Sequence, residues 1–151
     1  NPKIMDVAVP ANRAIGQTLE KFLLPGDEIA ADQCNDALAK GSVKLVDLRS
    51  DGERRRDGAI PDSIHVPYER LEKALAPGGR LHEMHARHPE QIVLYCAFGE
   101  RSALALDSAR RHGYTGMRHL RGGLAAWLRA KGAVEPVSKY EFPAQSVPPG
   151  C

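Results

Sequence analysis

The chain has 151 residues, of which 42% are hydrophobic and 26% are charged, and its formal net charge is +2. This length supports one domain with its own core and is too short for two. Acidic and basic residues are interleaved in similar numbers, so there is neither a basic stripe for nucleic acid nor a polybasic patch for a membrane surface. We expect no nucleic acid and no membrane among the partners.

The three cysteines, Cys34, Cys96 and Cys151, stand at wide spacings. An odd count without a Cys-x-x-Cys pair fits neither a disulfide framework nor a paired zinc or redox site, which favours a reducing compartment. No apolar stretch is long enough to cross a bilayer, and the beginning of the chain lacks a signal-peptide pattern. The expected location is therefore cytoplasmic, although a chain that begins with Asn1 is also compatible with a removed export signal.

Three regions are predicted along the chain. Residues 1–27 form an N-terminal extension with one short amphipathic stretch, Ile15–Leu24. Residues 28–134 form the folded domain. Residues 135–151 are rich in Pro, Ser and Val and form a C-terminal tail or linker.

Four short runs of β-branched or aliphatic residues predict strands. In chain order, these runs are Val43–Val46, Ile64–Val66, Ile92–Tyr95 and Met117–Leu120. Helical patterns separate several of them. The alternation predicts an α/β fold with a central parallel sheet of about five strands and helices on both faces.

Three helices can be placed from their patterns and stop signals. They run from Ala31 or Asp32 to about Lys40, from Ser102 to a stop at Gly113, and onward from Gly122-Gly123. The residues expected to face inward are Cys34, Ala37 and Leu38 in the first, Leu104, Ala105 and Ala109 in the second, and Leu124, Trp127 and Leu128 in the third.

The segment from Tyr95 to Ser102 joins a predicted strand directly to a predicted helix. So short a connection must turn sharply, helped by Gly99, and its backbone N–H groups then point into the turn. Cys96 lies at the base of this turn, where the N–H groups, the positive helix end and the Arg101 side chain would favour the thiolate. Such a thiolate is a nucleophile, and the same donors would hold a persulfide anion. The alternative is a cysteine that only packs.

The loop Cys96-Ala97-Phe98-Gly99-Glu100-Arg101-Ser102 resembles the active-site loop of the rhodanese-like family, which reads Cys-x-x-Gly-x-Arg-Ser in many single-domain members. Other segments are similar to that family in the same order along residues 28–134. They are Leu45-Val46-Asp47-Leu48-Arg49, the segment from Gly58 to Pro67, Gly113-Tyr114, Leu120-Arg121-Gly122-Gly123 and Ala126-Trp127.

The resemblance implies a rhodanese-like fold and a sulfurtransferase that moves a sulfane sulfur from a donor, such as thiosulfate or a persulfide, to a thiol or cyanide acceptor. Cys96 would carry the sulfur as a persulfide. The residues that would bind the substrate are Ala97, Phe98, Gly99, Glu100, Arg101 and Ser102. Asp47 and Arg49 would lie nearby in a supporting role, which we interpret as an ion pair. The scheme needs no cofactor or metal, and its partners are a small sulfur donor and a small-molecule or protein thiol.

The sequence departs from the family pattern at three positions. Ala59 stands where the family usually has His, and Asp62 stands where it usually has Gly. Glu100 places a carboxylate in a loop that many members fill with a neutral or basic residue. This charge puts reactivity with doubly charged thiosulfate in doubt.

Two other functions share this architecture. One is a non-catalytic rhodanese-like module for binding or regulation. The other is a thiol phosphatase or arsenate reductase, but such enzymes have a loop one residue longer, and the four residues between Cys96 and Arg101 form a tight cradle for a tetrahedral oxyanion.

Several remaining residues are expected to have no chemical role. The arginine run 54–56 is interpreted as a solvated turn. The histidines His82, His85 and His88 lack a fourth ligand and are expected to be solvated. Cys34 is expected to pack in the core, and Cys151 to be an incidental terminal thiol.

Overall fold

The computed structural model describes residues 23–138. All five strands are parallel and form one sheet in the order β1-β5-β4-β2-β3. The strands are β1 (Glu28–Ile29), β2 (Lys44–Asp47), β3 (Ile64–His65), β4 (Ile92–Tyr95) and β5 (Arg118–Leu120). This arrangement confirms the predicted α/β class and the parallel sheet of about five strands.

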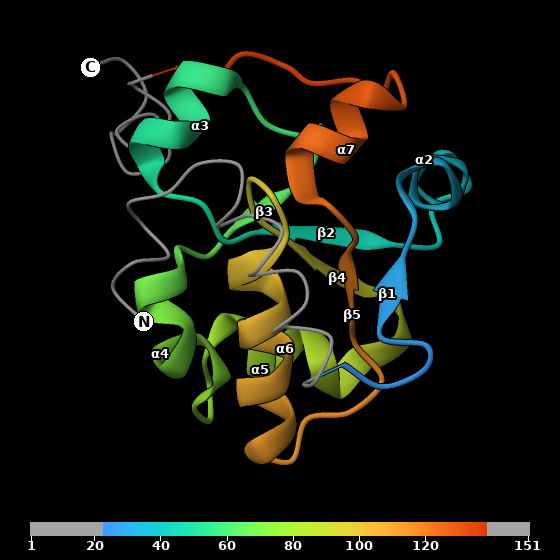
Figure 1. The fold of residues 1–151 in the computed structure, drawn as a ribbon. Coiled ribbons are helices and arrows are strands. Elements are labelled where there is room, and N and C mark those ends of the chain that lie inside the picture. The colour runs from blue at the N-terminus through green and yellow to red at the C-terminus, as the bar shows by residue number, and fades with distance from the viewer. Residues whose placement is uncertain (1–22, 139–151) are drawn as a thin grey trace, which may run out of the picture.

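Helices cover both faces of the sheet (Figure 1). The helices on one side are α2 (Ala31–Ala39), α3 (Asp51–Asp57) and α7 (Gly123–Arg129). Those on the other side are α4 (Leu71–Leu75), α5 (Arg80–Arg87) and α6 (Glu100–Arg111). Two short 3-10 helices, η2 (Tyr68–Arg70) and η3 (Pro89–Gln91), lie in the connections.

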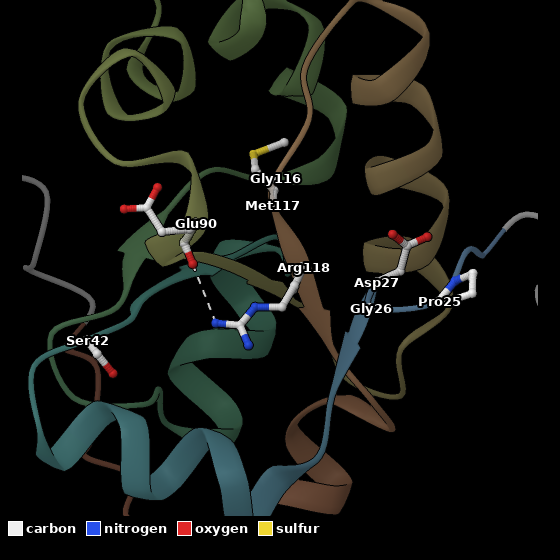
Figure 2. A pocket seen from close by; sticks show the side chains of 8 residues that line it. All are labelled: Pro25, Gly26, Asp27, Ser42, Glu90, Gly116, Met117 and Arg118. Atoms are coloured by element: carbon white, nitrogen blue, oxygen red, sulfur yellow. Dashed lines mark hydrogen bonds between the residues drawn. The ribbon is translucent and has the colours of Figure 1, made fainter.

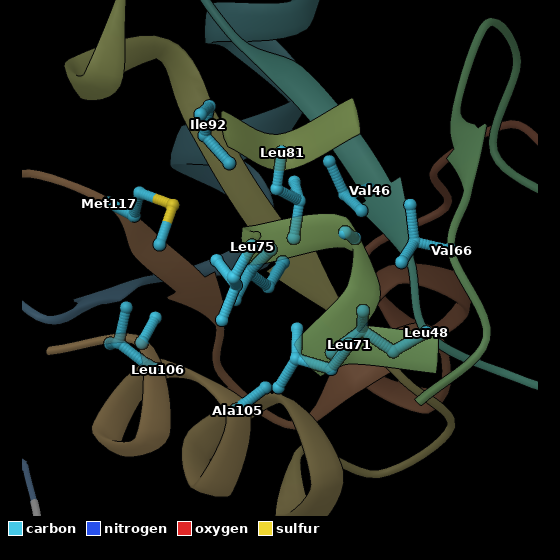
Figure 3. Packing of buried hydrophobic residues seen from close by; sticks show 13 residues of the cluster. Val46, Leu48, Val66, Leu71, Leu75, Leu81, Ile92, Ala105, Leu106 and Met117 are labelled. Atoms are coloured by element: carbon cyan, nitrogen blue, oxygen red, sulfur yellow. The ribbon is translucent and has the colours of Figure 1, made fainter. Parts of the chain in front are cut away.

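Strand β4 lies between β5 and β2, and its four residues are all buried. Because successive side chains of a strand point to opposite faces, Ile92 and Leu94 enter one core and Val93 and Tyr95 enter the other. Figure 3 shows the first core, between the sheet and helices α4, α5 and α6. A strand buried on both faces reads as a continuous apolar run, which is why this strand was predictable.

The four predicted strand runs coincide with β2, β3, β4 and β5. The two-residue strand β1 was not placed, because Glu28–Ile29 is too short for a periodic signal. Helix α6 begins at Glu100, two residues before the predicted start at Ser102. The chain turns at Gly99 with φ +104°, so the helix can start directly after it.

Three expectations about burial were wrong. Leu104 and Leu128 are exposed, although both were predicted to face the core. Each lies on the solvent side of its helix, where a single exposed leucine is ordinary. Arg54 is only 3% exposed, so the arginine run is not a solvated turn. It forms the last turn of α3, and one of its three side chains points inward to a buried carboxylate.

The proposed division at residues 27 and 135 stays a prediction. The amphipathic stretch Ile15–Leu24 lies almost entirely outside the described residues, as does Cys151. At the other end, Glu135 pairs with Ala59 in an isolated antiparallel bridge. Within residues 23–138, no helix is long and apolar enough to span a membrane.

Candidate active site

Cys96 lies at the carboxyl end of β4, at the base of the loop that leads into α6. Its sulfur accepts hydrogen bonds from the backbone N–H groups of Gly99, at 3.1 Å, and Ser102, at 3.4 Å. The side chain of Cys96 is fully buried. The expected cup of backbone donors is therefore present, with two N–H groups directed at one sulfur atom.

The start of α7 holds this loop from outside. The N–H groups of Leu124 and Ala125 donate to the carbonyl oxygens of Cys96 and Ala97, at 2.8 and 3.0 Å. This contact requires Gly123, because a Cβ atom there would lie 2.4 Å from the Cys96 oxygen. The Gly-Gly pair thus allows a helix end to pack against the loop backbone.

Glu100 turns its carboxylate toward the Cys96 sulfur. The Cys96 thiol donates to Glu100 Oε1 at 3.4 Å, and a carboxylate favours the protonated thiol. Burial, followed by the charge of Glu100, raises the pKa of the Cys96 thiol, while the Ser102 hydrogen bonds and Arg101 lower it. The expectation that the loop lowers this pKa was therefore wrong, because burial and Glu100 outweigh the dipoles of the loop.

Arg101 forms its hydrogen bonds with Glu53, and its Nε lies 3.7 Å from Glu100 Oε1. Its guanidinium donates two hydrogen bonds of 2.8 Å to the two carboxylate oxygens of Glu53, in the first turn of α3. Glu53 also accepts from the backbone N–H of Ser50, and the two residues form a capping box. The pKa of Glu53 falls to about 2, mainly because of the hydrogen bonds from Arg101. Arg101 thus connects the segment from Cys96 to Ser102, which we call the cysteine loop, to α3.

Beneath the sulfur lies a chain of polar side chains that the sequence did not reveal. The thiol of Cys96 lies 3.7 Å from Ser102 Oγ, which lies 2.9 Å from Nδ1 of His119. The other ring nitrogen of His119 lies 3.1 Å from the carboxylate of Glu28. We call Cys96, Glu100, Ser102 and His119 the cysteine cluster.

A second set of buried polar groups lies at the end of the neighbouring strand β2. Arg49 donates to both carboxylate oxygens of Asp47, at 3.0 and 2.9 Å, and Arg54 donates to the same carboxylate at 3.0 Å. The hydroxyl of Tyr95 adds a fourth side-chain donor at 2.8 Å. The expected ion pair between Asp47 and Arg49 is present, and we call these four residues the arginine cluster.

The remaining predicted residues have separate surroundings. Phe98 is 59% exposed at the tip of the loop, as expected of an aromatic residue without core partners. Cys34 is fully buried against the sheet, and burial raises the pKa of its thiol to about 11. Cys34 therefore packs in the core as a protonated thiol.

Four polar residues near the site were missed by sequence reasoning: Glu28, Glu53, Arg54 and His119. Glu53 could have been found from the Ser-x-x-Glu capping box that begins at Ser50. His119 carried a weaker signal, as a polar residue inside an otherwise apolar strand run. The partner of Glu28 lies 91 positions away in the sequence. The contact of Arg54 with Asp47 could be predicted only if the position of helix α3 were known.

A separate pocket opens at the amino ends of the strands, on the opposite side of the sheet from the carboxyl ends, where Cys96 lies (Figure 2). It is lined by residues at or before the amino ends of the strands: Pro25, Gly26, Asp27, Ser42, Glu90, Gly116, Met117 and Arg118. Ligand sites of parallel sheets gather at the carboxyl ends instead, where Cys96 lies. The cysteine loop is therefore the stronger candidate.

Comparisons with known proteins identify the family of the chain. A family model of the rhodanese-like domain matches residues 30–130. Human thiosulfate:glutathione sulfurtransferase is 33% identical over 106 residues, with 66% of this chain and 91% of the relative covered. A sulfurtransferase from Allochromatium vinosum is 32% identical over 106 residues, with 68% of this chain and 89% of the relative covered.

Two solved structures share the fold at 29% identity. The human single-domain sulfurtransferase TSTD1 has a TM-score of 0.57, with 69% of this chain and 96% of that chain covered. A Rhodopseudomonas palustris protein of unknown function, described as a possible tyrosine phosphatase, has a TM-score of 0.66, with 82% and 93% covered. The family match spans well over half of the sequence, and this chain belongs to the rhodanese-like domain family.

Proposed function

We propose that this protein is a sulfurtransferase that carries sulfur as a persulfide on Cys96. The observation that carries the proposal is the pair of backbone N–H groups, from Gly99 and Ser102, directed at one buried sulfur. Donors fixed in this way stabilise an anion without reorganising during the reaction. The relatives of this chain that are named as sulfurtransferases support the same class of chemistry.

The reaction has two steps. The Cys96 thiolate attacks the outer sulfur of a donor, a bond forms between the two sulfur atoms, and the donor's own bond to that sulfur breaks. The leaving group, which is sulfite when the donor is thiosulfate, keeps the electron pair. An acceptor thiolate or cyanide then attacks the outer sulfur of the persulfide, and Cys96 leaves as a thiolate. The physiological partners we propose are a small sulfur donor and a thiol.

Access to the sulfur requires a local movement, because Cys96 exposes none of its surface. Glu100 contacts the sulfur, and its side chain is 24% exposed, so it is the residue that a donor must displace. A donor with fewer negative charges than thiosulfate meets less repulsion there. We therefore expect persulfides and other singly charged donors to react faster than thiosulfate.

The carboxylate beside the sulfur also argues against phosphate chemistry. A phosphate dianion bound over Cys96 would lie against Glu100, whose oxygen is 3.4 Å from the sulfur, inside a loop with only four residues before Arg101. The protein should therefore release no more phosphate from an aryl phosphate than its Cys96→Ser form. Cysteine-dependent release would favour the phosphatase instead.

Intact-mass measurement tests the proposal. After treatment with thiosulfate or with glutathione persulfide, the protein should gain one sulfur atom, and cyanide should remove it. The Cys96→Ser variant should gain none, whereas Cys34→Ser, which alters a buried thiol outside the loop, should behave as the wild type. An adduct that persists in Cys96→Ser would overturn the assignment, and no adduct in the wild type would favour a non-catalytic module.

A further inference from the structure

We propose that Ser102 and His119 relay the proton of the Cys96 thiol, and that the Glu28 carboxylate stabilises the imidazolium that results. This inference rests on the proposed function, since it says how the nucleophile of that reaction loses its proton. It assigns a role to two residues outside the loop, one on β5 and one on β1.

The strand register brings the members of the relay together. Glu28 and His119 are direct partners in the parallel pairing of β1 with β5. Side chains at paired positions point to the same face of a sheet, so both lie on the side toward α6. Ser102 lies in the first turn of α6 and is fully buried there, between Cys96 and His119.

The hydrogen-bond partners determine the direction of the relay. The Glu28 carboxylate can only accept, so Nε2 of His119 carries a hydrogen and Nδ1 is the acceptor. The hydroxyl of Ser102 then donates to Nδ1 at 2.9 Å. The Gly99 oxygen is the other acceptor near this hydroxyl and lies farther away, at 3.2 Å. Ser102 Oγ is thus left to accept from the thiol of Cys96.

The surroundings of His119 make its imidazole a base that is neutral before the reaction and charged during it. Its side chain is 3% exposed, and burial lowers the pKa of the imidazole, which Glu28 and the more distant Asp27 oppose and Arg121 reinforces. Asp27 itself is bound by Arg110 of α6. A neutral imidazole beside a carboxylate is ready to accept one proton and to form an ion pair with it.

One proton moves through two bonds in this step. The thiol proton passes to Ser102 Oγ as the hydroxyl proton passes to Nδ1 of His119, so the serine is unchanged. Cys96 becomes a thiolate and His119 an imidazolium, and no net charge is created. When the acceptor has removed the sulfur and Cys96 leaves as a thiolate, the proton returns by the same route.

Glu100 offers the thiol a second acceptor, 3.4 Å away on the outer side. In solution an imidazole is a better proton acceptor than a carboxylate by about two pKa units. A donor must also displace the Glu100 side chain to reach the sulfur, which removes that acceptor at the moment of attack. Ser102 and His119 are both buried, so displacing the Glu100 side chain leaves the route through Ser102 in place.

The test is the rate at which iodoacetamide alkylates Cys96, measured from about pH 5 to about pH 10. This reagent is neutral and needs no sulfur donor. The wild type should show two rising steps, because the thiolate forms first as a pair with the imidazolium and again when the imidazolium loses its proton. In His119→Asn, the amide oxygen can still accept from Ser102 but cannot take a proton. The lower step should disappear, and the rate at pH 7 should fall by roughly 10- to 100-fold.

Two further variants separate the relay from a packing effect. Glu28→Gln should keep both steps but reduce the rate on the first, because the imidazolium loses its counter-charge. His112→Asn changes an exposed histidine at the other end of α6 and should leave the profile unchanged. Two steps in His119→Asn, or a single step in the wild type, would overturn the relay.

If His119→Asn does not fold, the titration of His119 by NMR in the wild type and in Cys96→Ser decides the question. A shared proton makes His119 keep its imidazolium to higher pH in the wild type than in the variant. Identical titrations would reject the relay. These readouts involve no sulfur transfer, so a protein with two steps that never gains sulfur would refute the proposed function and leave the relay standing.

Discussion

The arginine cluster and the cysteine cluster lie at the carboxyl ends of neighbouring strands, yet they are built in opposite ways. In the arginine cluster, the single carboxylate of Asp47 accepts from two guanidiniums and a tyrosine hydroxyl, and every one of these bonds is 3.0 Å or shorter. In the cysteine cluster, the thiol has two acceptors at 3.4 and 3.7 Å and two backbone donors. The arginine cluster therefore holds its charges in fixed pairs. In the cysteine cluster, the proton of the Cys96 thiol has two possible acceptors.

This difference separates a structural site from a reactive one. A buried charge with several close partners is held rigidly, and removing one partner leaves the others uncompensated. A buried thiol with competing partners can change its protonation state, which a nucleophile requires. We therefore expect changes in the arginine cluster to act on stability and changes in the cysteine cluster to act on reactivity.

The largest effect is expected from Asp47→Asn, which removes the buried carboxylate charge that Arg49 and Arg54 share. The free energy of unfolding should fall by about 3 to 5 kcal/mol, as measured by urea denaturation. The control is Asp57→Asn in an exposed pair with Arg56, where no measurable loss is expected. A loss in Asp47→Asn no greater than in the control would contradict a structural role for the cluster.

The next effect tests how α7 holds the cysteine loop. Gly123→Ala places a Cβ 2.4 Å from the Cys96 oxygen, whereas Gly41→Ala has a similar positive φ and no atom within 4 Å. Gly123→Ala should be about 2 to 3 kcal/mol less stable than Gly41→Ala, because a backbone clash adds to the shared conformational strain. It should also change the alkylation rate of Cys96. Equal stabilities in thermal unfolding would mean that the contact with α7 can relax freely.

The pair of Arg101 with Glu53 gives a pH-dependent effect. Because the pKa of Glu53 is lowered to about 2, its contribution to the free energy of unfolding is complete above the unfolded-state pKa near 4.5. This contribution is lost as pH falls toward 2. At pH 7, Glu53→Gln should cost about 2 kcal/mol, less than the full pKa depression implies, because the pair is partly exposed. The unfolding free energies of the variant and the wild type should converge in acid. A gap that is constant with pH would show that the charge of Glu53 is not involved.

The smallest effect concerns the rim of the cysteine cluster. Glu100→Gln should lower the pKa of Cys96 and remove one negative charge from the path of thiosulfate. The apparent second-order rate with thiosulfate should rise by about tenfold, or roughly 1.4 kcal/mol, and the gain should shrink as salt is added. A less charged donor should gain less. Equal gains for all donors, or a gain independent of salt, would mean that Glu100 acts through the shape of the loop.

The sequence determined the layered α/β fold and the position of Cys96 at the end of a strand. Strand β4 and the centre of β2 are buried on both faces and therefore appear as apolar runs, and Cys96 directly follows β4. These are local signals, in which each residue is interpreted from its neighbours in the chain. The ion pair between Asp47 and Arg49 was expected from the family resemblance, and it is also local, since a single residue separates its members.

The protonation of Cys96 was decided by tertiary structure. The sequence places Arg101 and a helix start beside the thiol, which predicts a lowered pKa, but Arg101 turns to Glu53, 48 positions away. His119 and Glu28 are 91 positions apart and meet only because β1 pairs with β5. A charge acts through its distance and its burial, and both depend on which strands lie side by side. The pattern of the chain therefore placed Cys96 at the turn between a strand and a helix, and tertiary packing determined which groups surround its thiol.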